Sequence, residues 1–398
     1  MAKPNYNVVL FPFPAHGHIT PQLTLAARLH RFHPNLTITL VSTPRNIASI
    51  RSSLPPTSPL QLHSLPFCPA DHGLITDSES TEDLPTGQFP TFFFAIESIR
   101  PAFDHFIAEA SKQSTVCIIS DMLLGWTLDV ARKHHVFHSS FLGTSALGGA
   151  VFVSVLMNLP HIHSDSDPFT LPEYPEKSQM MELALGLEAS GRPFIWVIRP
   201  PLGYNAKDEF KDEWLPDGFE KRMKDENRGF FVHGWAPQIA ILSHKSIGAF
   251  LSHCGWNSVL ESLNSGVPII GWPLQAEQPF NVTLLVELGV CVEVVRGKLE
   301  TSEVKKEKVA DTVEMVMGDN EKGHNMREKA KEISKMMKRA WKDESCSSAE
   351  GIAEFLKLIK RLYNNPIILG YKESNKTHLL TTKESYLLTP LIIFIWRD

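Results

Sequence analysis

The chain has 398 residues, of which 43% are hydrophobic, and its 39 basic and 44 acidic side chains give a formal net charge of −5 at pH 7. This length and apolar content predict a soluble globular protein with two domains of ordinary size. The slightly acidic balance excludes a broad electrostatic attraction to nucleic acid or to an anionic membrane.

Cysteine spacing and the apolar segments indicate the compartment. The five cysteines are Cys68, Cys117, Cys254, Cys291 and Cys346, and no two of them form a C-x-x-C pair. This spacing favours reduced thiols of a cytosolic protein over a disulfide framework or a zinc site. The N-terminus lacks the basic region and long apolar run of a secretory signal, and the apolar stretch 387–396 is too short to span a bilayer as a helix. We therefore expect a cytoplasmic chain that acts as a monomer, with no membrane span.

Apolar runs alternate with amphipathic stretches in the first half of the chain, which is typical of βα units with a parallel sheet. The pattern predicts strands at 8–13, 36–43 and 116–121, a helix at 21–30 and a helical stretch at 125–135. Thr20 is the expected N-cap of the first helix, with Pro21 at its first position. These elements form a predicted N-terminal Rossmann-like domain, residues 1–176.

The second half begins again with a helix and a strand. Helical spacing predicts helices at 178–190, 256–265, 280–288, 302–317, 322–341 and 348–362, and apolar runs predict strands within 191–199, 229–235, 247–255, 267–273 and 290–294. We take 177–362 as a C-terminal Rossmann-like domain and 363–398 as a tail. The predicted fold class is α/β, with two doubly wound parallel sheets and a cleft between them, where ligands would lie at the carboxyl ends of the strands.

A phosphate site is predicted where one of these strands turns into a helix. Residues His253 to Ser258 (HCGWNS) follow an apolar strand and open a helix, whose first N–H groups and positive dipole end would face an anion. Asn257 and Ser258 add side-chain donors, as does His253. The alternative interpretation is that Asn257 and Ser258 only cap the helix and that His253 is a hydrogen-bonded turn residue.

A longer segment carries a family resemblance. Residues 235–278 begin with WAPQ, pass through HCGWNSVLES and end in AEQ. This gapless stretch resembles the signature box of plant secondary-product glycosyltransferases, the family 1 UDP-glycosyltransferases, and it is far more specific than a short glycine motif. The resemblance implies the two-domain GT-B fold and a UDP-sugar donor.

The resemblance also implies a role for each part of the box. Trp235 would stack on the uracil ring, Ala236 would bind the base edge through its backbone with Gln238 beside it, and Glu261 would accept hydrogen bonds from the ribose hydroxyls. The diphosphate would be held by His253, Gly255, Asn257 and Ser258. The sugar hydroxyls would be bound by Trp256, Glu277 and Gln278. Gln at the last position implies glucose. The alternative for the two tryptophans is packing in the core.

The chemistry is expected in the first half of the chain. The segment FPFPAHGH, residues 11–18, follows the first strand and resembles the N-terminal motif of the family, in which the histidine after glycine is the general base. That residue is His18, and Asp121 matches the aspartate that orients the base; His16 receives no catalytic role. Histidine titrates near neutral pH and suits the removal of a proton from an acceptor hydroxyl.

In this scheme the carboxylate fixes the tautomer of the imidazole, and direct displacement inverts the anomeric centre. Because the helix end and His253 absorb the charge of the leaving UDP, no metal or other cofactor is required. The alternatives are a surface histidine with an ordinary strand-end aspartate, or a metal site built from His16, His18 and Asp121.

The sequence departs from the family in two places. Between residues 170 and 178 we find no counterpart of the strand that opens the second domain of the family, nor of its Gly-Ser pair. A sheet that lacks a strand is expected to leave neighbouring N–H and C=O groups unpaired and apolar surface exposed. The tail 363–398 matches nothing in the family, and its apolar end is expected to lack a partner and to favour aggregation.

We therefore expect an inverting UDP-glycosyltransferase that transfers glucose from UDP-glucose to a hydroxyl of a small lipophilic acceptor, such as a phenolic, a flavonoid or a terpenoid. The alternative is a catalytically impaired, truncated copy that at most binds UDP or associates with an intact relative. A nicotinamide-dependent oxidoreductase is disfavoured because no G-x-G-x-x-G follows a strand.

Overall fold

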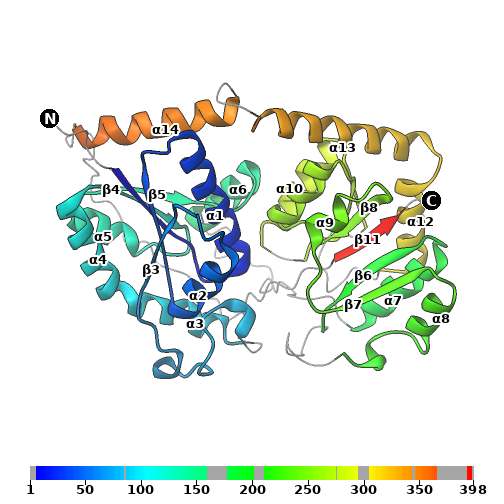
Figure 1. Ribbon diagram of the computed structural model, residues 1–398. Helices are drawn as coiled ribbons and strands as arrows, with labels where there is room; N and C mark the ends of the chain where they lie inside the picture. The colour runs from blue at the N-terminus through cyan, green and yellow to red at the C-terminus, as the bar shows by residue number, and fades with distance from the viewer. Residues whose placement is uncertain are drawn as a thin grey trace. The chain divides into compact units, whose positions relative to one another are not determined.

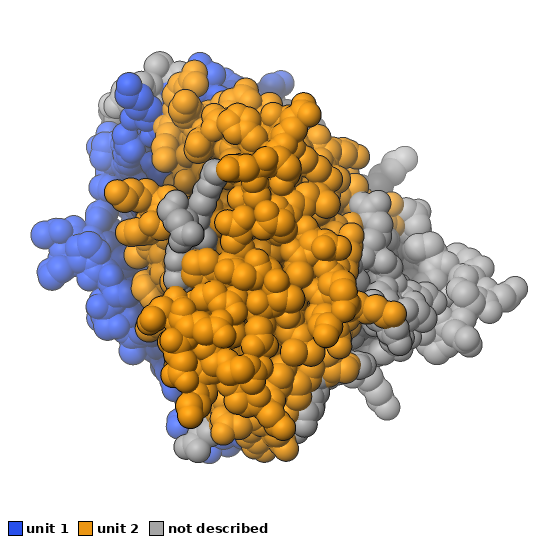
Figure 2. Space-filling model, turned by 90° about the vertical axis from the view of Figure 1, so that its right-hand side faces the viewer, with its two compact units in different colours: residues 1–143, 340–387 blue, residues 144–339, 388–398 orange. Residues whose placement is uncertain are grey.

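The computed structural model describes residues 6–84, 87–158, 177–200, 210–274, 276–294, 304–342, 346–364 and 392–396. The chain divides into two compact units, residues 1–143 with 340–387 and residues 144–339 with 388–398 (Figure 2). These units differ from the predicted ranges, because the first unit ends at residue 143 and the helix Ala146–Asn158 belongs to the second. In addition, the last long helix belongs to the first unit and the last strand to the second.

Unit 1 is built on a five-stranded sheet with the order β3-β2-β1-β4-β5, in which every neighbouring pair is parallel. Its strands are β1 (Tyr6–Phe11), β2 (Thr37–Ser42), β3 (Gln61–Ser64), β4 (Thr115–Asp121) and β5 (Phe137–Phe141). The central strands β1 and β4 are almost wholly buried, as expected for strands covered on both faces. The predicted strands at 8–13, 36–43 and 116–121 are thereby confirmed to within a few residues.

Helices surround this sheet (Figure 1). They are α1 (His16–Phe32), α2 (Pro44–Ser53), α3 (Phe89–Ala95), α4 (Arg100–Gln113), α5 (Thr127–Lys133) and α14 (Ser347–Asn364), with short 3-10 helices at Pro69–His72, Thr81–Asp83 and Ile96–Ile99. Helix α14 joins unit 1 although it follows the second half of the chain, because its Leu356 and Ile359 are buried against Val8 and Leu10 of β1. This apolar contact stabilises the helix on the first sheet.

The start of α1 was predicted wrongly. The helix begins at His16, with Ala15 as its N-cap, and Pro21 lies inside it rather than at its first position. Proline removes one intrahelical hydrogen bond, but a helix tolerates this loss near its N-terminus more readily than in its middle. The consequence is functional, because the earlier start places His18 in the first turn of the helix.

Unit 2 contains a six-stranded sheet with the order β10-β9-β8-β11-β6-β7. Its strands are β6 (Phe194–Ile198), β7 (Gly229–His233), β8 (Ile247–Ser252), β9 (Ile269–Gly271), β10 (Cys291–Glu293) and β11 (Ile392–Trp396). The pairs β6–β7, β8–β9 and β9–β10 are parallel, whereas β11 is antiparallel to both of its neighbours, β6 and β8. Five strands therefore run in one direction, and one strand from the end of the chain runs against them.

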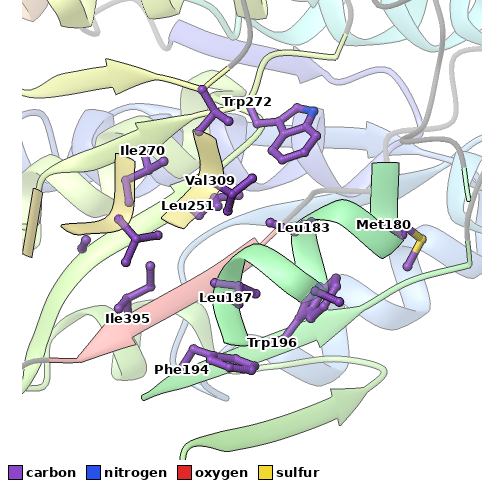
Figure 3. Close-up of a cluster of buried hydrophobic side chains, with 14 of the residues drawn as sticks. Met180, Leu183, Leu187, Phe194, Trp196, Leu251, Ile270, Trp272, Val309 and Ile395 are labelled. Atoms are coloured by element: carbon purple, nitrogen blue, oxygen red, sulfur yellow. The ribbon is translucent and has the colours of Figure 1, made fainter. Parts of the chain in front are cut away.

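Five helices of unit 2 match predicted helical segments, whereas the helices at Ala146–Asn158, Phe219–Asp225 and Gln238–Leu242 were not predicted. The helices of unit 2 are α6 (Ala146–Asn158), α7 (Lys177–Ala189), α8 (Phe219–Asp225), α9 (Gln238–Leu242), α10 (Trp256–Ser265), α11 (Gln278–Glu287), α12 (Lys306–Met317) and α13 (Glu321–Arg339), with a 3-10 helix at Asp212–Trp214. The core lies between the sheet and the pair α7 and α12, where Leu183, Leu187 and Val309 pack with Trp196 of β6 and Leu251 of β8 (Figure 3).

The expectation of an apolar tail without a partner is wrong for residues 392–396. These residues form β11 inside the sheet, between β6 and β8, and Ile395 is fully buried in the core (Figure 3). The predicted unpaired edges at this place are likewise wrong, because β11 pairs with both neighbouring strands. An unpaired strand edge is a template for any apolar segment that can reach it. The join 159–176 and the tail segment 365–391 lie outside the described residues.

Within the part of the chain that the structure describes, no helix is both long and apolar enough to cross a bilayer.

Candidate functional site

The structure brings His18 and Asp121 together. Nδ1 of His18 lies 2.7 Å from Oδ2 of Asp121, across a separation of 103 residues. The contact forms because β1 and β4 are neighbouring parallel strands, so that the helix after β1 starts beside the last residue of β4. The Asp121 side chain is 2% exposed and the His18 side chain 26%, so that solvent reaches the imidazole and not the carboxylate.

Local hydrogen bonds fix both partners. The second carboxylate oxygen of Asp121, Oδ1, accepts a hydrogen bond of 3.0 Å from the backbone N–H of Leu123. At the start of α1, the backbone N–H of His16 donates a hydrogen bond of 2.8 Å to Oε1 of Glu82, a residue that the sequence did not point to. Because first-turn N–H groups have no partner inside their own helix, Glu82 stabilises the turn that carries His18.

Aromatic side chains lie beside the imidazole. The rings of Phe13 and His18 are 5.8 Å apart in an edge-to-face arrangement, and Phe13 also contacts Phe89 and Phe93 at 5.9 and 6.1 Å. Phe93 contacts Phe94, whose side chain is 51% exposed. Phenylalanines of α3 therefore give the surroundings of the histidine an apolar character.

The turn between β8 and α10 is formed by Cys254 and Gly255. Cys254 has a φ of +64°, and Gly255, the N-cap of α10, has no side chain to occupy the helix end. The alternative in which Asn257 or Ser258 caps this helix is therefore wrong. A Cβ atom on Gly255 would lie 2.5 Å from Nε2 of His253, so the close approach of the imidazole to the turn requires glycine here.

Two side chains that sequence reasoning missed hold this turn. Nδ2 of Asn281, on α11, donates a hydrogen bond of 3.0 Å to the carbonyl oxygen of Cys254. Oδ1 of Asn281 accepts a hydrogen bond of 2.7 Å from Oγ of Ser145, and both residues are buried. The signal in the sequence is slight, because a single Asn in an amphipathic helix ordinarily reads as a solvent-facing residue.

Residues of α9 and α10 that were predicted to bind the UDP-sugar contact one another. Nε2 of Gln238 donates hydrogen bonds to Oε2 of Glu261 at 2.7 Å and to Oγ of Ser258 at 3.3 Å. The contact is long-range in sequence, which shows that the two ends of the WAPQ…HCGWNS segment form one surface. The amide thereby orients the Glu261 carboxylate.

The two tryptophans of the box differ in their surroundings. Trp235 follows β7 and is 71% exposed, so that packing in the core is excluded for it. Trp256 packs on the cluster around Val259 and Leu263, which partly supports the core interpretation for this residue. Ala236, between Trp235 and the helix α9, is buried with Leu242 and Phe250 and anchors the segment.

The end of the box forms the start of α11. Glu277 is the N-cap of this helix and Gln278 its first residue. The Gln278 side chain is 1% exposed, and its Oε1 accepts a hydrogen bond of 2.9 Å from the backbone N–H of Leu274. Gln278 thus shapes the preceding loop, and its contact with a sugar stays a prediction.

A metal site and a cysteine nucleophile are two other kinds of functional site to consider. Among the described residues, no group of three or more His, Cys, Asp or Glu side chains could hold a metal ion. The five cysteines are free, and burial raises the pKa of the Cys254 thiol well above its usual value. Cys254 is therefore a packing residue of the turn rather than a nucleophile.

Solved structures with the same fold are known. The chain superposes with a TM-score of 0.72 and 21% identity on UGT73P12 of Glycyrrhiza uralensis, solved with glycyrrhetinic acid 3-O-monoglucuronide, covering 92% of this chain and 98% of that one. It superposes with a TM-score of 0.67 and 22% identity on UGT71G1 of Medicago truncatula, solved with UDP-glucose, covering 90% and 98%. The fold is therefore that of GT-B glycosyltransferases.

Sequence relatives define the family. Residues 170–338 match the family described as UDP-glucoronosyl and UDP-glucosyl transferase. The chain is 33% identical to UDP-glycosyltransferase 92A1 of Arabidopsis thaliana over 487 positions, covering 91% of this chain and 99% of that protein, and 31% identical to crocetin glucosyltransferase 3 of Crocus sativus, covering 72% and 85%. The chain belongs to the plant UDP-glycosyltransferases, enzymes that glycosylate small molecules.

The first of these alignments is longer than the chain itself, 487 positions against 398 residues. The Arabidopsis relative therefore has segments without a counterpart here.

Proposed function

We propose that the protein transfers glucose from UDP-glucose to a hydroxyl of a small lipophilic acceptor, with inversion at the anomeric carbon. The observation that carries this proposal is the 2.7 Å contact between Nδ1 of His18 and Oδ2 of Asp121. With the carboxylate on Nδ1, the ring nitrogen that would take the proton of a substrate hydroxyl is Nε2.

The step needs one proton transfer and one displacement. Nε2 of His18 takes the proton of the acceptor hydroxyl while the hydroxyl oxygen forms a bond to C1 of the sugar. The bond from C1 to the β-phosphate oxygen breaks, and UDP leaves with the electron pair. Attack from the opposite face turns an α-linked donor into a β-glycoside, and Asp121 stabilises the imidazolium that forms.

The turn at Gly255 supports the proposed diphosphate site. The free end of α10 and the imidazole of His253 would neutralise the negative charge that grows on UDP as it leaves. The exposed indole of Trp235 offers a flat surface for uracil, and Glu261, held by Gln238, offers an acceptor for the ribose hydroxyls. We propose that these residues work without a metal ion or another cofactor.

The phenylalanines next to His18 support a lipophilic acceptor. Phe13 contacts the imidazole at 5.8 Å, and Phe89 and Phe93 contact Phe13 at 5.9 and 6.1 Å, so that apolar rings extend from the histidine. A phenol, flavonoid or terpenoid would place its apolar body on such rings and its hydroxyl at Nε2. We propose a monomer of the cytoplasm, in line with the free cysteines and the acidic net charge.

A second candidate is a catalytically impaired copy that binds UDP without transferring sugar. The observation that favours it is the alignment with a longer relative, whose extra segments have no counterpart in this chain. The two candidates predict the same UDP binding and opposite results for product formation.

The direct experiment incubates the purified chain with UDP-glucose and a panel of phenolic, flavonoid and terpenoid acceptors. Mass spectrometry detects a hexoside, and NMR coupling at the anomeric proton assigns its configuration. A β-glucoside supports the proposal, an α-glucoside overturns inversion, and UDP binding in calorimetry without any product supports the second candidate.

The uracil site has its own test. Trp235→Ala is expected to weaken UDP binding by about 5- to 150-fold, because base–aromatic stacking contributes ~1–3 kcal/mol. Phe230→Ala is the matched control, since Phe230 is an exposed aromatic of β7 that the proposal leaves outside the site. Equal effects of the two substitutions on the UDP dissociation constant would remove Trp235 from the site.

A further inference from the structure

The strand β11 is the only described link between two parts of the unit 2 sheet. On one side, β6 pairs with β7; on the other, β8 pairs with β9 and β9 with β10. Among the described strands, β6 and β8 do not pair with each other, and each pairs with β11. Without residues 392–396 the sheet would be a two-stranded and a three-stranded piece, with a gap one strand wide between them.

The backbone pairing of β11 is extensive for a short strand. Ile392 to Ile395 lie opposite Val197 to Phe194 of β6, and Ile392 to Trp396 lie opposite Ser252 to Ile247 of β8, with an irregularity after Ile395. Each side of the gap would otherwise present a row of unpaired N–H and C=O groups inside the unit, which is unfavourable. The five residues IIFIW therefore satisfy the backbone groups of two strands at once.

The buried surface requires an apolar segment in the gap. Ile395 is 0% exposed and packs in the cluster that contains Phe194 of β6, Leu251 of β8 and Leu187 of α7 (Figure 3). A central strand that is covered on both faces reads as a continuous apolar run, and IIFIW has this pattern without a charge. Extended peptides with charged or short side chains would leave a cavity or a buried charge here.

Strand β11 begins next to the turn that is predicted to bind the UDP diphosphate. Ile392 pairs with Ser252, the last residue of β8, and His253 and the turn follow directly. A split between β8 and β6 would therefore run to the edge of the sheet that carries this turn.

We propose that the gap between β6 and β8 is a strand-binding site for an apolar extended peptide, and that its occupant is the carboxyl-terminal strand of the same chain. The site binds this strand even when the strand is not covalently joined to the rest of the chain. Unit 2 is therefore completed by β-strand addition. Residues 365–391 connect α14 to β11, and a segment of this length reaches at most about 90 Å, which is ample within one molecule.

The first test separates the strand from the chain. A variant that ends at Leu387 is mixed with a labelled synthetic peptide of residues 388–398, extended by lysines for solubility. We expect saturable one-to-one binding by fluorescence anisotropy, together with recovery of a cooperative thermal transition that the shortened chain lacks. The matched peptide carries Ile395→Asp and is expected not to bind. The proposal is overturned if the shortened chain melts like the full chain, or if both peptides bind equally.

The second test uses the full chain and does not depend on the shortened variant being soluble. Leu251 and Ile393 are directly opposite, whereas Leu251 and Ile392 are out of register by one residue. After oxidation, the double variant Leu251→Cys/Ile393→Cys is expected to give an intramolecular disulfide in peptide mapping, and Leu251→Cys/Ile392→Cys is not. Disulfide-linked dimers would show that a second copy supplies the strand, and this result, like the absence of any cross-link, overturns the proposal.

A point substitution completes the comparison. Ile395→Asp is expected to lower the melting temperature of the full chain by about 10 °C, because it places a charge in the core between β6 and β8. Met336→Asp introduces the same charge at an exposed position of α13, where Met336 is 59% exposed, and is expected to leave the melting temperature nearly unchanged. Similar shifts for the two variants would contradict the buried position of Ile395. None of these readouts depends on UDP binding or on glycosyl transfer.

Discussion

Nδ1 of His18 is held 2.7 Å from Oδ2 of Asp121 by the pairing of two strands that lie more than 100 residues apart in the chain. The register of β1 against β4 runs from Tyr6 opposite Thr115 to Phe11 opposite Ser120. Both strands end at the same edge of the sheet, so a residue in the first turn of α1 meets the last residue of β4. The parallel topology itself therefore aligns the proposed base with its carboxylate.

Removal of either partner is expected to reduce transfer without loss of donor binding. His18→Ala removes the proton acceptor and should lower kcat by about 10²- to 10⁴-fold. Asp121→Asn keeps the shape of the side chain but removes the negative charge that stabilises the imidazolium, and we expect a comparable loss. The measurements are kcat with UDP-glucose and a reactive acceptor, and the dissociation constant of UDP by calorimetry.

His16→Ala is the control for the first pair of variants. His16 is two residues from His18 in the same helical turn, and the hydrogen bond to Glu82 is donated by its backbone N–H, which alanine retains. We expect activity near that of the unchanged protein. If His18→Ala retained full activity, or if His16→Ala lost as much, His18 would not be the base.

The pairing of His18 with Asp121 could be predicted from the resemblance of FPFPAHGH and of Asp121 to motifs of the family, and the turn at His253 from its place between an apolar run and a helix. His18 follows β1 and Asp121 ends β4, and these two strands end at the same edge of the unit 1 sheet, whereas His253 follows β8 of the unit 2 sheet. The start of α1 could not be predicted in this way, because the proline at position 21 is a strong helix-start signal. The hydrogen bond that the backbone N–H of His16 donates to Glu82, 66 positions away, has no local signal.

Tertiary pairing explains the other differences. Residues 392–396 read as a short apolar tail, and nothing in their own sequence says that β6 and β8 leave a gap of one strand. Asn281 is similar, since its role depends on the carbonyl group of Cys254 and the hydroxyl of Ser145, which are brought to it by other elements. Local sequence patterns predict the helices and strands. The roles of residues 392–396 and of Asn281 depend on partners that are distant in the sequence.

Asn281→Ala is expected to destabilise the turn between β8 and α10, which is the proposed diphosphate site. The substitution removes the donor to the carbonyl of Cys254 and the acceptor for the hydroxyl of Ser145, which should cost about 1–3 kcal/mol of stability. The same loss of support should reduce UDP affinity, while Thr283→Ala, at an exposed position of the same helix, should change neither. Thermal denaturation and UDP calorimetry measure the two effects, and an unchanged Asn281→Ala protein would show that the turn is stable without this side chain.

Gly186 is expected to be essential for the packing of α7 on α12. A Cβ atom at this position would lie 2.4 Å from Cβ of Val309 and 2.8 Å from the carbonyl oxygen of Lys306, which is part of the backbone. Gly186→Ala should therefore destabilise unit 2 by about 1–3 kcal/mol, although alanine favours helices. The control is Gly351→Ala in α14, where a Cβ atom meets no atom within 4 Å. Chemical denaturation compares the two, and a stabilised Gly186→Ala protein would contradict the close approach.

His138 is expected to make the stability of the protein depend on pH. Its Nε2 lies within 3.0 Å of the hydroxyl oxygens of Ser120 and Thr127, and burial, followed by the charge of Arg132, lowers its pKa to about 4 from an ordinary value of 6.5. Between these two pH values the unfolded chain binds a proton at this residue and the folded chain does not. Stability contributed by the neutral imidazole is therefore fully present above pH 6.5 and is lost as the pH falls towards 4.

The size of this effect is about 2–3 kcal/mol over that interval, with partial exposure of the ring taken into account. His138→Gln should flatten the decline in the free energy of unfolding between pH 6.5 and 4, while His105→Gln, at an exposed position of α4, should leave the slope unchanged. Denaturant titrations at intervals of half a pH unit measure the slope. Equal slopes for the His138→Gln and unchanged proteins would show that another group, and not this buried imidazole, controls the acid stability of unit 1.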